Sequence, residues 1–106
     1  IDTLSVFKTD QVDKSPELKS SYLELLSIIQ YPAEARRVGA TGKVIVKLVV
    51  TPSGEGISHY IESSPHPALS KESIRIANKA TFKPGMKNGK AVYSWFTLPI
   101  EFQLGK

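Results

Sequence analysis

The two histidines, His59 and His66, carry the side chains of this chain best suited to act as a general acid, a general base or a metal ligand. His59 alternates with Ile57 and Ile61 in a strand-like stretch, so we expect these three side chains on one face, with His59 as a half-buried structural residue. His66 lies between two prolines and is interpreted as a loop residue. Because neither histidine belongs to an H-E-x-x-H pair and the chain has no cysteine, the sequence predicts no metal site, no cofactor and no enzyme activity.

Residues 85–91, GMKNGKA, and the aromatic pair Tyr93 and Trp95 suggest two other kinds of chemistry, phosphate binding and base stacking. A phosphate loop needs a following helix whose N-terminus points at the phosphate, but the pattern after Gly89 indicates a strand. Aromatic rings on a sheet face can hold single-stranded nucleic acid; the alternative is that both rings pack under the N-terminal helix. We favour packing and expect no nucleic-acid partner.

The positive charge of the chain does not identify a partner. The formal net charge is +4, a balance that can attract polyanions. Four lysines surround a Pro/Gly turn, and the others are scattered among acidic residues. The four are Lys79, Lys83, Lys87 and Lys90. We interpret them as solvated loop lysines.

The sequence does predict one binding feature, a strand whose backbone N–H and carbonyl groups are unpaired along one side. Residues 93–104, YSWFTLPIEFQL, alternate apolar and polar side chains as a half-buried strand does, yet Pro99 lies in their interior. Proline has no N–H to donate to a ladder and is confined to edge strands, strand starts and bulges. This strand is therefore predicted to lie at an edge. If Pro99 points its backbone groups outward, then Tyr93, Trp95 and Thr97 do too, and we expect these three to bond an incoming extended peptide.

Helical periodicity precedes the predicted sheet. Apolar residues recur at helical spacing after Ser15 and Pro16, which predicts a helix near residues 17–30. A short strand or an ordered arm is expected at residues 4–8. Pro32 suits the first position of a second, short helix, which Gly39 ends.

The remaining elements define the fold class. Gly42 opens a strand, and the turn TPSGEG returns the chain, so residues 43–63 are predicted to form a hairpin. Ser70 is expected to cap an amphipathic helix near residues 70–80, followed by a turn-rich connection, KPGMKNGK, to the last strand. A right-handed crossover through this helix places the third strand beside the first. The prediction is a single α+β domain whose three-stranded antiparallel sheet has the order 2-1-3, with helices packed on it.

Three segments, in this order, resemble the C-terminal domain of TonB, the periplasmic energy transducer family: QYPAEARRVGATGKVIVKLVVTPSGEG, ALSKESIRIANKATFKPG and NGKAVYSWFTLPIEFQL. The resemblance covers residues 28–104. It divides the chain into an N-terminal arm and helix, residues 1–27, and a TonB-like domain, residues 28–106. Two positions depart from the family pattern: Ser70 stands where Asp is common, and Phe82 where an aromatic residue, often Trp, precedes the Pro-Gly turn.

The resemblance implies a module without catalytic activity that acts in nutrient uptake. It would lie in the periplasm, tethered to the inner membrane by an upstream helix absent from this chain and coupled there to a proton-driven motor of ExbB and ExbD type. Its partner would be a TonB-dependent outer-membrane transporter, whose N-terminal box peptide adds to the edge of the third strand. In the family a Gln-Tyr-Pro segment also contacts the transporter. The predicted partner-binding residues are Gln30, Tyr31, Pro32, Val92, Tyr93, Ser94, Trp95, Phe96, Thr97 and Leu98.

Two alternatives accompany this interpretation. A TonB-like domain can also end a sensor metallopeptidase of BlaR type, where it would bind a regulatory partner. An exposed edge strand also favours self-association, so a homodimer is a second expected partner arrangement.

Overall fold

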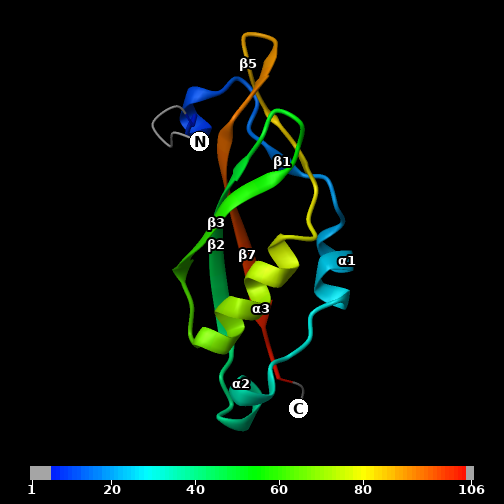
Figure 1. The fold of residues 1–106 in the computed structure, drawn as a ribbon, viewed down its shortest axis with the longest axis vertical. Coiled ribbons are helices and arrows are strands. Elements are labelled where there is room, and N and C mark those ends of the chain that lie inside the picture. The colour runs from blue at the N-terminus through cyan, green and yellow to red at the C-terminus, as the bar shows by residue number, and fades with distance from the viewer. Residues whose placement is uncertain (1–5, 105–106) are drawn as a thin grey trace.

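The computed structural model describes residues 6–104 of the chain, and its centre is a three-stranded antiparallel sheet (Figure 1). The strands are β2 (Gly42–Val50), β3 (Gly56–Ser63) and β7 (Ser94–Phe102), in the order β3-β2-β7. This is the predicted order 2-1-3 and the predicted α+β class. The helix α3 (Pro67–Ala77) connects β3 to the rest of the chain and lies across one face of the sheet.

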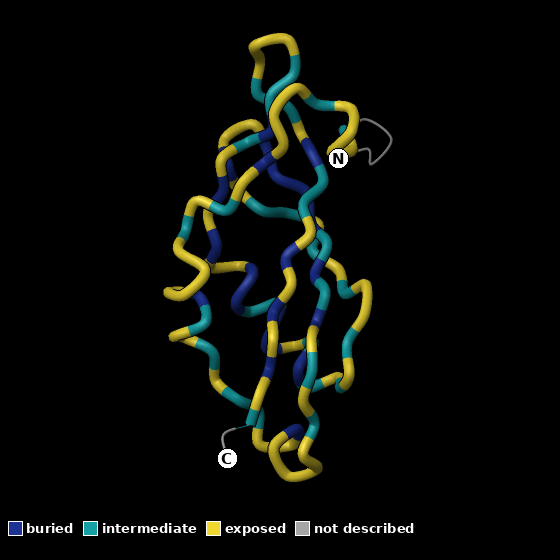
Figure 2. Tube along the Cα trace, turned by 180° about the vertical axis from the view of Figure 1, so that it is seen from behind, coloured by how far each residue is buried: buried dark blue, intermediate teal, exposed yellow. Residues whose placement is uncertain are grey.

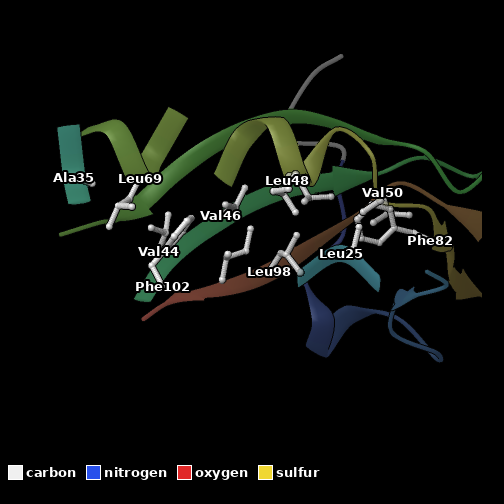
Figure 3. Close-up of a cluster of buried hydrophobic side chains, with 14 residues drawn as sticks. Leu25, Ala35, Val44, Val46, Leu48, Val50, Leu69, Phe82, Leu98 and Phe102 are labelled. Carbon is white, nitrogen blue, oxygen red and sulfur yellow. The ribbon is translucent and has the colours of Figure 1, made fainter. Parts of the chain in front are cut away.

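The core lies between that face and the helices. Alternate residues of β2 and β7 point into it, as the sequence pattern predicted, and side chains of all three α-helices complete it (Figure 3). Its most buried members include Val44, Val46, Leu48, Leu69, Leu98 and Phe102. The opposite face of the sheet has no α-helix over it among the described residues (Figures 1 and 2). Along the strands, buried and exposed residues therefore alternate.

Two small sheets lengthen the molecule to 49 × 25 × 19 Å. The strand β1 (Glu17–Leu18) pairs with β4 (Phe82–Lys83), and β5 (Gly85–Lys87) pairs with β6 (Lys90–Val92), both antiparallel. The expected turn-rich connection is thus a β-hairpin. Its turn residues Asn88 and Gly89 have φ values of 52° and 76°, the left-handed pair that a two-residue hairpin turn of type I′ requires.

The first predicted helix is wrong in its extent. The helix α1 covers Tyr22–Ser27 rather than 17–30, and the Ser21 side chain accepts its capping hydrogen bond from the Glu24 N–H at 3.4 Å. Residues 17–18 are strand β1 instead, because their backbone pairs with β4, a segment far away in the sequence. The short second helix is confirmed as α2 (Ala33–Arg37), with Gly39 beyond its end at a φ of 68°. Pro32 is its N-cap, with extended backbone, rather than its first residue as predicted.

The third predicted helix begins earlier than expected. Its N-cap is His66 rather than Ser70: the Nδ1 atom of His66 accepts a hydrogen bond of 3.0 Å from the Ala68 N–H, and Pro67 occupies the first turn. His66 itself has extended backbone and lies outside the helix, so its interpretation as a loop residue is confirmed. A histidine between prolines gave no capping signal that we recognised, although proline early in a helix is common.

A bulge in β3 also corrects one prediction. Ile57 pairs with Val49 and Ile61 pairs with Val46, and these partners point to opposite faces of β2. Ile57 and Ile61 therefore do not share a face. The cause is Ser58, whose φ of 54° shifts the register between the two pairs.

Within residues 6–104, no helix has the length and the apolar character that crossing a membrane requires.

Candidate functional site

The edge of β7 is the candidate site. Among the strands of residues 6–104, β7 has one neighbour in the central sheet, β2, with a continuous register from Gly42 opposite Phe102 to Val50 opposite Ser94. The backbone groups of successive strand residues point alternately to the two sides. The Trp95 N–H and the Tyr93 carbonyl both face away from β2, because each bonds another segment. The odd-numbered residues from Tyr93 to Glu101 thus form the outward set, which includes Pro99 as the sequence predicted.

The N-terminal part of this edge is already occupied by the chain itself, which corrects the expectation of a free rim. Phe7 forms a parallel bridge to Ser94: its N–H donates to the Tyr93 carbonyl at 3.0 Å, and its carbonyl accepts from the Trp95 N–H at 2.9 Å. The expected strand or ordered arm near residues 4–8 is therefore an ordered arm from Val6 onward. Residues 4 and 5 lie outside the described residues.

Tyr22, from α1, contacts the C-terminal part of the edge. The Tyr22 hydroxyl donates to the Pro99 carbonyl at 2.8 Å. Burial raises the pKa of the Tyr22 phenol, and the nearby Glu101 carboxylate acts in the same direction. The phenol therefore remains protonated at neutral pH and keeps its capacity to donate. Without an N–H at Pro99, its carbonyl is the group that a hydroxyl donor can satisfy there.

Between these two contacts lies Thr97. No backbone group among residues 6–104 pairs with its N–H or its carbonyl on the outward side, and its side chain is exposed. The unpaired main chain of β7 is thus narrower than the sequence predicted. Its centre is Thr97, with the Trp95 carbonyl beside it.

An aromatic groove adjoins Thr97 on the sheet face opposite the core. The ring of Trp95 meets the ring of Tyr60 edge to face, with centroids 6.2 Å apart. A cavity of about 570 Å³ lies here, and Lys8 and Lys47 also line it. The expectation that Trp95 packs under the N-terminal helix is therefore wrong, because its ring lies against β3. The turn η2 (Thr9–Gln11), part of the arm, forms the rim.

The other predicted edge residues have different places. Ser94 and Leu98 are buried, and their backbone groups face β2; Phe96 packs against Phe82 with ring centroids 5.1 Å apart. Val92 belongs to β6, where it pairs with Gly85. Of the residues predicted between 92 and 98, the odd-numbered ones alone present their main chain at the edge.

The predicted Gln30, Tyr31 and Pro32 contact region lies at the far end of β7. The rings of Tyr31 and Phe102 meet edge to face, with centroids 5.7 Å apart. The Arg36 guanidinium lies 5.2 Å from the centroid of the Tyr31 ring. At about 3.4 Å per residue, Trp95 and Phe102 are about 24 Å apart along the strand. The structure therefore does not bring the two predicted contact regions together.

A buried carboxylate holds the Gln30 end of this segment. The Glu72 carboxylate of α3 accepts hydrogen bonds from the Gln30 N–H at 2.7 Å and from the Arg75 guanidinium at 2.7 and 2.9 Å. The bonded Arg75 lowers the pKa of Glu72, which stays ionised at neutral pH despite its burial. An open pocket of about 820 Å³ separates Pro32 from α3. The pocket is lined mainly by the segment and by one face of α3.

The two histidines lie in different elements: His59 is in β3, and His66 caps α3. His59 is half-buried, as predicted; its Nε2 atom is buried without a hydrogen-bond partner, and burial lowers its pKa. Within the described part of the chain, no three His, Cys, Asp or Glu side chains gather as a metal would need.

Sequence reasoning missed the residues that border the free edge. Phe7 and Tyr22 reach β7 across more than seventy positions of sequence. Tyr60, the partner of Trp95, lies on β3, which β2 separates from β7, and next to a bulge. The apolar residues within LSVFK signalled an ordered segment, but nothing local indicated which edge it would pair with.

The comparisons with known proteins agree with this architecture. Residues 28–104 match the family model of the Gram-negative bacterial TonB protein C-terminal domain. The chain is 32% identical over 76 residues to Protein tonB2 of Pseudomonas aeruginosa; the match covers 71% of this chain and 28% of that protein. The chain therefore spans little more than a quarter of the relative's length.

Two solved structures share the fold. The solution structure of the Pseudomonas aeruginosa TonB C-terminal domain superposes with a TM-score of 0.62 at 23% identity, covering 94% of this chain and 95% of that one. The TonB C-terminal domain of Helicobacter pylori gives a TM-score of 0.59 at 18% identity, covering 79% and 78%. With the family model matched over residues 28–104, the chain belongs to the family of TonB C-terminal domains.

Proposed function

We propose that this domain is the periplasmic docking module of a TonB-type energy transducer, and that it binds the N-terminal box of TonB-dependent outer-membrane transporters by strand addition to β7. An upstream segment would tether it to the inner membrane and to a proton-driven motor of ExbB and ExbD type. The domain would act by binding and pulling, without catalysis. Family membership supports the transducer role.

The observation that carries the proposal is the outward main chain of Thr97, an exposed residue of an edge strand, whose N–H and carbonyl no backbone group of residues 6–104 pairs with on that side. An extended peptide beside β7 would find there an N–H and a carbonyl pointing outward, and main-chain hydrogen bonds supply affinity in this mode of recognition. Side chains of the peptide would alternate between the groove beside Trp95 and the opposite side, near α1. A ladder of this kind also suits force transmission, because pulling along a strand loads several hydrogen bonds together.

The outward residues Tyr93, Trp95 and Thr97 are the proposed main-chain contacts. The segment Gln30, Tyr31 and Pro32 is the proposed second contact, at the other end of β7. Phe102, which the Tyr31 ring contacts, lies about 24 Å from Trp95 along β7, a distance that corresponds to about seven residues of extended chain. One transporter can therefore touch both regions only through a longer stretch of peptide or through its folded part.

The proposal is tested by titrating the isotope-labelled domain with synthetic box peptides of TonB-dependent transporters while following backbone amide resonances. We expect the Thr97 amide to shift and its hydrogen exchange to slow on binding, because its N–H gains an acceptor. A box peptide with proline at alternate positions is the control, since it cannot supply a continuous ladder. Shifts confined to the lysine-rich hairpin at residues 83–90 would instead indicate an electrostatic site and would overturn strand addition.

A further inference from the structure

We propose that the N-terminal arm, residues 6–11, is an internal competitor for the β7 edge, so that a transporter peptide adds to β7 only after Phe7 has left it. This inference rests on the proposed function and concerns the regulation of the same site.

The contacts of Phe7 make the two states mutually exclusive. Its N–H donates to the Tyr93 carbonyl at 3.0 Å, and its carbonyl accepts from the Trp95 N–H at 2.9 Å. These are the outward groups adjacent to Thr97, and a guest strand centred on Thr97 needs them for its own ladder. The Trp95 N–H can be donated fully to one acceptor, so the arm and the guest cannot both hold it.

The free edge is shorter than a ladder formed by strand addition. Tyr22 covers the Pro99 carbonyl at one end, and Phe7 holds the other. Between these two contacts, and as far as residues 6–104 show, Thr97 and the Trp95 carbonyl remain, which is about one residue of ladder, whereas strands in proteins usually run to several residues. A peptide that binds with a longer ladder must therefore displace a contact at one end. At the end held by the arm, the next outward groups of β7 are the Trp95 N–H and the Tyr93 carbonyl. At the other end the next outward residue is Pro99, which has no N–H to offer a peptide.

The arm is held weakly. After Phe7 the chain leaves the edge: the Lys8 N–H donates to the Gln11 side chain at 2.9 Å, which closes the turn η2, so that Thr9 does not continue the ladder to the Trp95 carbonyl. Residues 8–11 are exposed, and within the described arm Val6 is the one buried side chain. Val6 and the two hydrogen bonds of Phe7 are therefore the main attachments of the arm.

The next segment is anchored independently, so that the arm can detach without wider unfolding. The Asp13 and Lys14 N–H groups donate to the Met86 carbonyl at 2.8 and 3.2 Å, and the Met86 N–H donates to the Lys14 carbonyl at 2.9 Å. The Asp13 carboxylate also accepts from the Asn88 N–H at 2.7 Å. These contacts to the β5–β6 hairpin do not involve β7. Figure 1 shows the arm beside the upper end of the sheet, near this hairpin.

Two substitutions release the arm by different means, and a third is their matched control. Phe7→Pro removes the N–H bonded to Tyr93, and Val6→Asp places a carboxylate at the buried anchor. Thr9→Pro introduces the same residue as the first variant at a position where no described hydrogen bond uses the N–H, after an extended Lys8. All three lie in the arm, so amide spectra should show the remainder of the domain folded in each.

Hydrogen exchange and peptide titration provide the readouts. We expect the Trp95 amide to be protected in the wild type and in Thr9→Pro, and to lose protection in Phe7→Pro and Val6→Asp. Synthetic transporter box peptides should bind the two released variants about tenfold more tightly than the wild type, because the binding-competent fraction rises. Thr9→Pro should bind as the wild type does. A synthetic peptide of residues 1–11 should displace the box peptide from Val6→Asp.

The outcomes separate this inference from the proposed function. Equal affinity of all four proteins, with Trp95 unprotected in the released variants, would leave strand addition standing and overturn the competition. Continued protection of Trp95 in both released variants would overturn it as well, as would failure of the 1–11 peptide to displace the box peptide. If no box peptide binds any form, both the proposed function and this inference are wrong.

Discussion

The N–H of Thr97, which no described residue uses, predicts that proline substitutions at two neighbouring positions of β7 affect different properties, peptide binding at one and folding at the other. The substitution Thr97→Pro removes a backbone donor that no described residue uses, at an outward position two residues from Pro99. Leu98→Pro, one residue further, removes a donor that faces β2 opposite Val46. We expect the first substitution to impair peptide binding and the second to impair folding.

The magnitudes follow from what each N–H bonds. Thr97→Pro should lower the free energy of unfolding by less than about 1 kcal/mol, because it breaks no ladder bond and leaves no buried group unsatisfied. Leu98→Pro leaves a carbonyl of β2 unpaired, at about 1–3 kcal/mol, and deletes much of a side chain that is 2% exposed, at about 2–5 kcal/mol. Against a typical total stability of about 5–15 kcal/mol, the second loss approaches unfolding.

Binding should follow the opposite order among the folded variants. The lost hydrogen bond of Thr97→Pro is worth about 0.5–1.5 kcal/mol net, a weakening of the box peptide by about 2- to 12-fold. Thr97→Ala keeps the N–H and loses an exposed side chain, so it should bind within about twofold of the wild type. Urea unfolding followed by circular dichroism measures the stabilities, and isothermal titration with box peptides measures the affinities.

Two results would refute this reasoning. If Thr97→Pro unfolds the domain as strongly as Leu98→Pro, then the outward orientation of the odd-numbered residues is wrong. If Thr97→Ala weakens binding as much as Thr97→Pro, the side chain rather than the main chain carries the contact, and strand addition at this position fails.

Three further predictions concern stability, each measured by urea unfolding. Because the bonded Arg75 lowers the pKa of Glu72 below 4.5, ionised Glu72 stabilises the fold above that pH and the stabilisation is lost as pH falls through the folded value; Glu72→Gln should be less stable at about pH 7 and show less acid sensitivity. Burial lowers the pKa of His59 below 6.5, so its protonation favours the unfolded state, and His59→Gln should reduce the loss of stability between about pH 7 and about pH 5. Gly54→Ala should cost about 2 kcal/mol or more, since its φ is 90° and the new Cβ would clash with the Phe82 carbonyl oxygen of β4. Gly39→Ala, with a φ of 68° and open space around it, is the control and should cost about 1 kcal/mol.

Elements with a strong local pattern were predicted with nearly correct limits. The apolar alternation of residues 44–50 predicted β2, and the turn at residues 51–56 predicted the hairpin with β3. Pro99 predicted an edge strand, because a missing donor affects the ladder wherever the strand lies. These features could be predicted because side-chain alternation and the missing N–H of a proline depend only on a few neighbouring residues.

Predictions failed where distant segments compete for a short stretch of backbone. Residues 17–18 have helical periodicity, but they pair with Phe82 and Lys83 as strand β1, so α1 starts only at Tyr22. Within the site, the pattern of β7 predicted which residues point outward, whereas it could not predict that Phe7 already occupies part of the edge.

The amino-acid sequence by itself determined the order of the sheet, the position of its edge strand and the orientation of the odd-numbered residues along it. These properties depend on side-chain alternation, one proline and short connections, which are local. The tertiary structure alone decided how much of that edge is free. Hydrogen bonds from Phe7 and Tyr22 join residues more than seventy positions apart, and such pairings depend on which segments the folded chain brings within about 3 Å of each other.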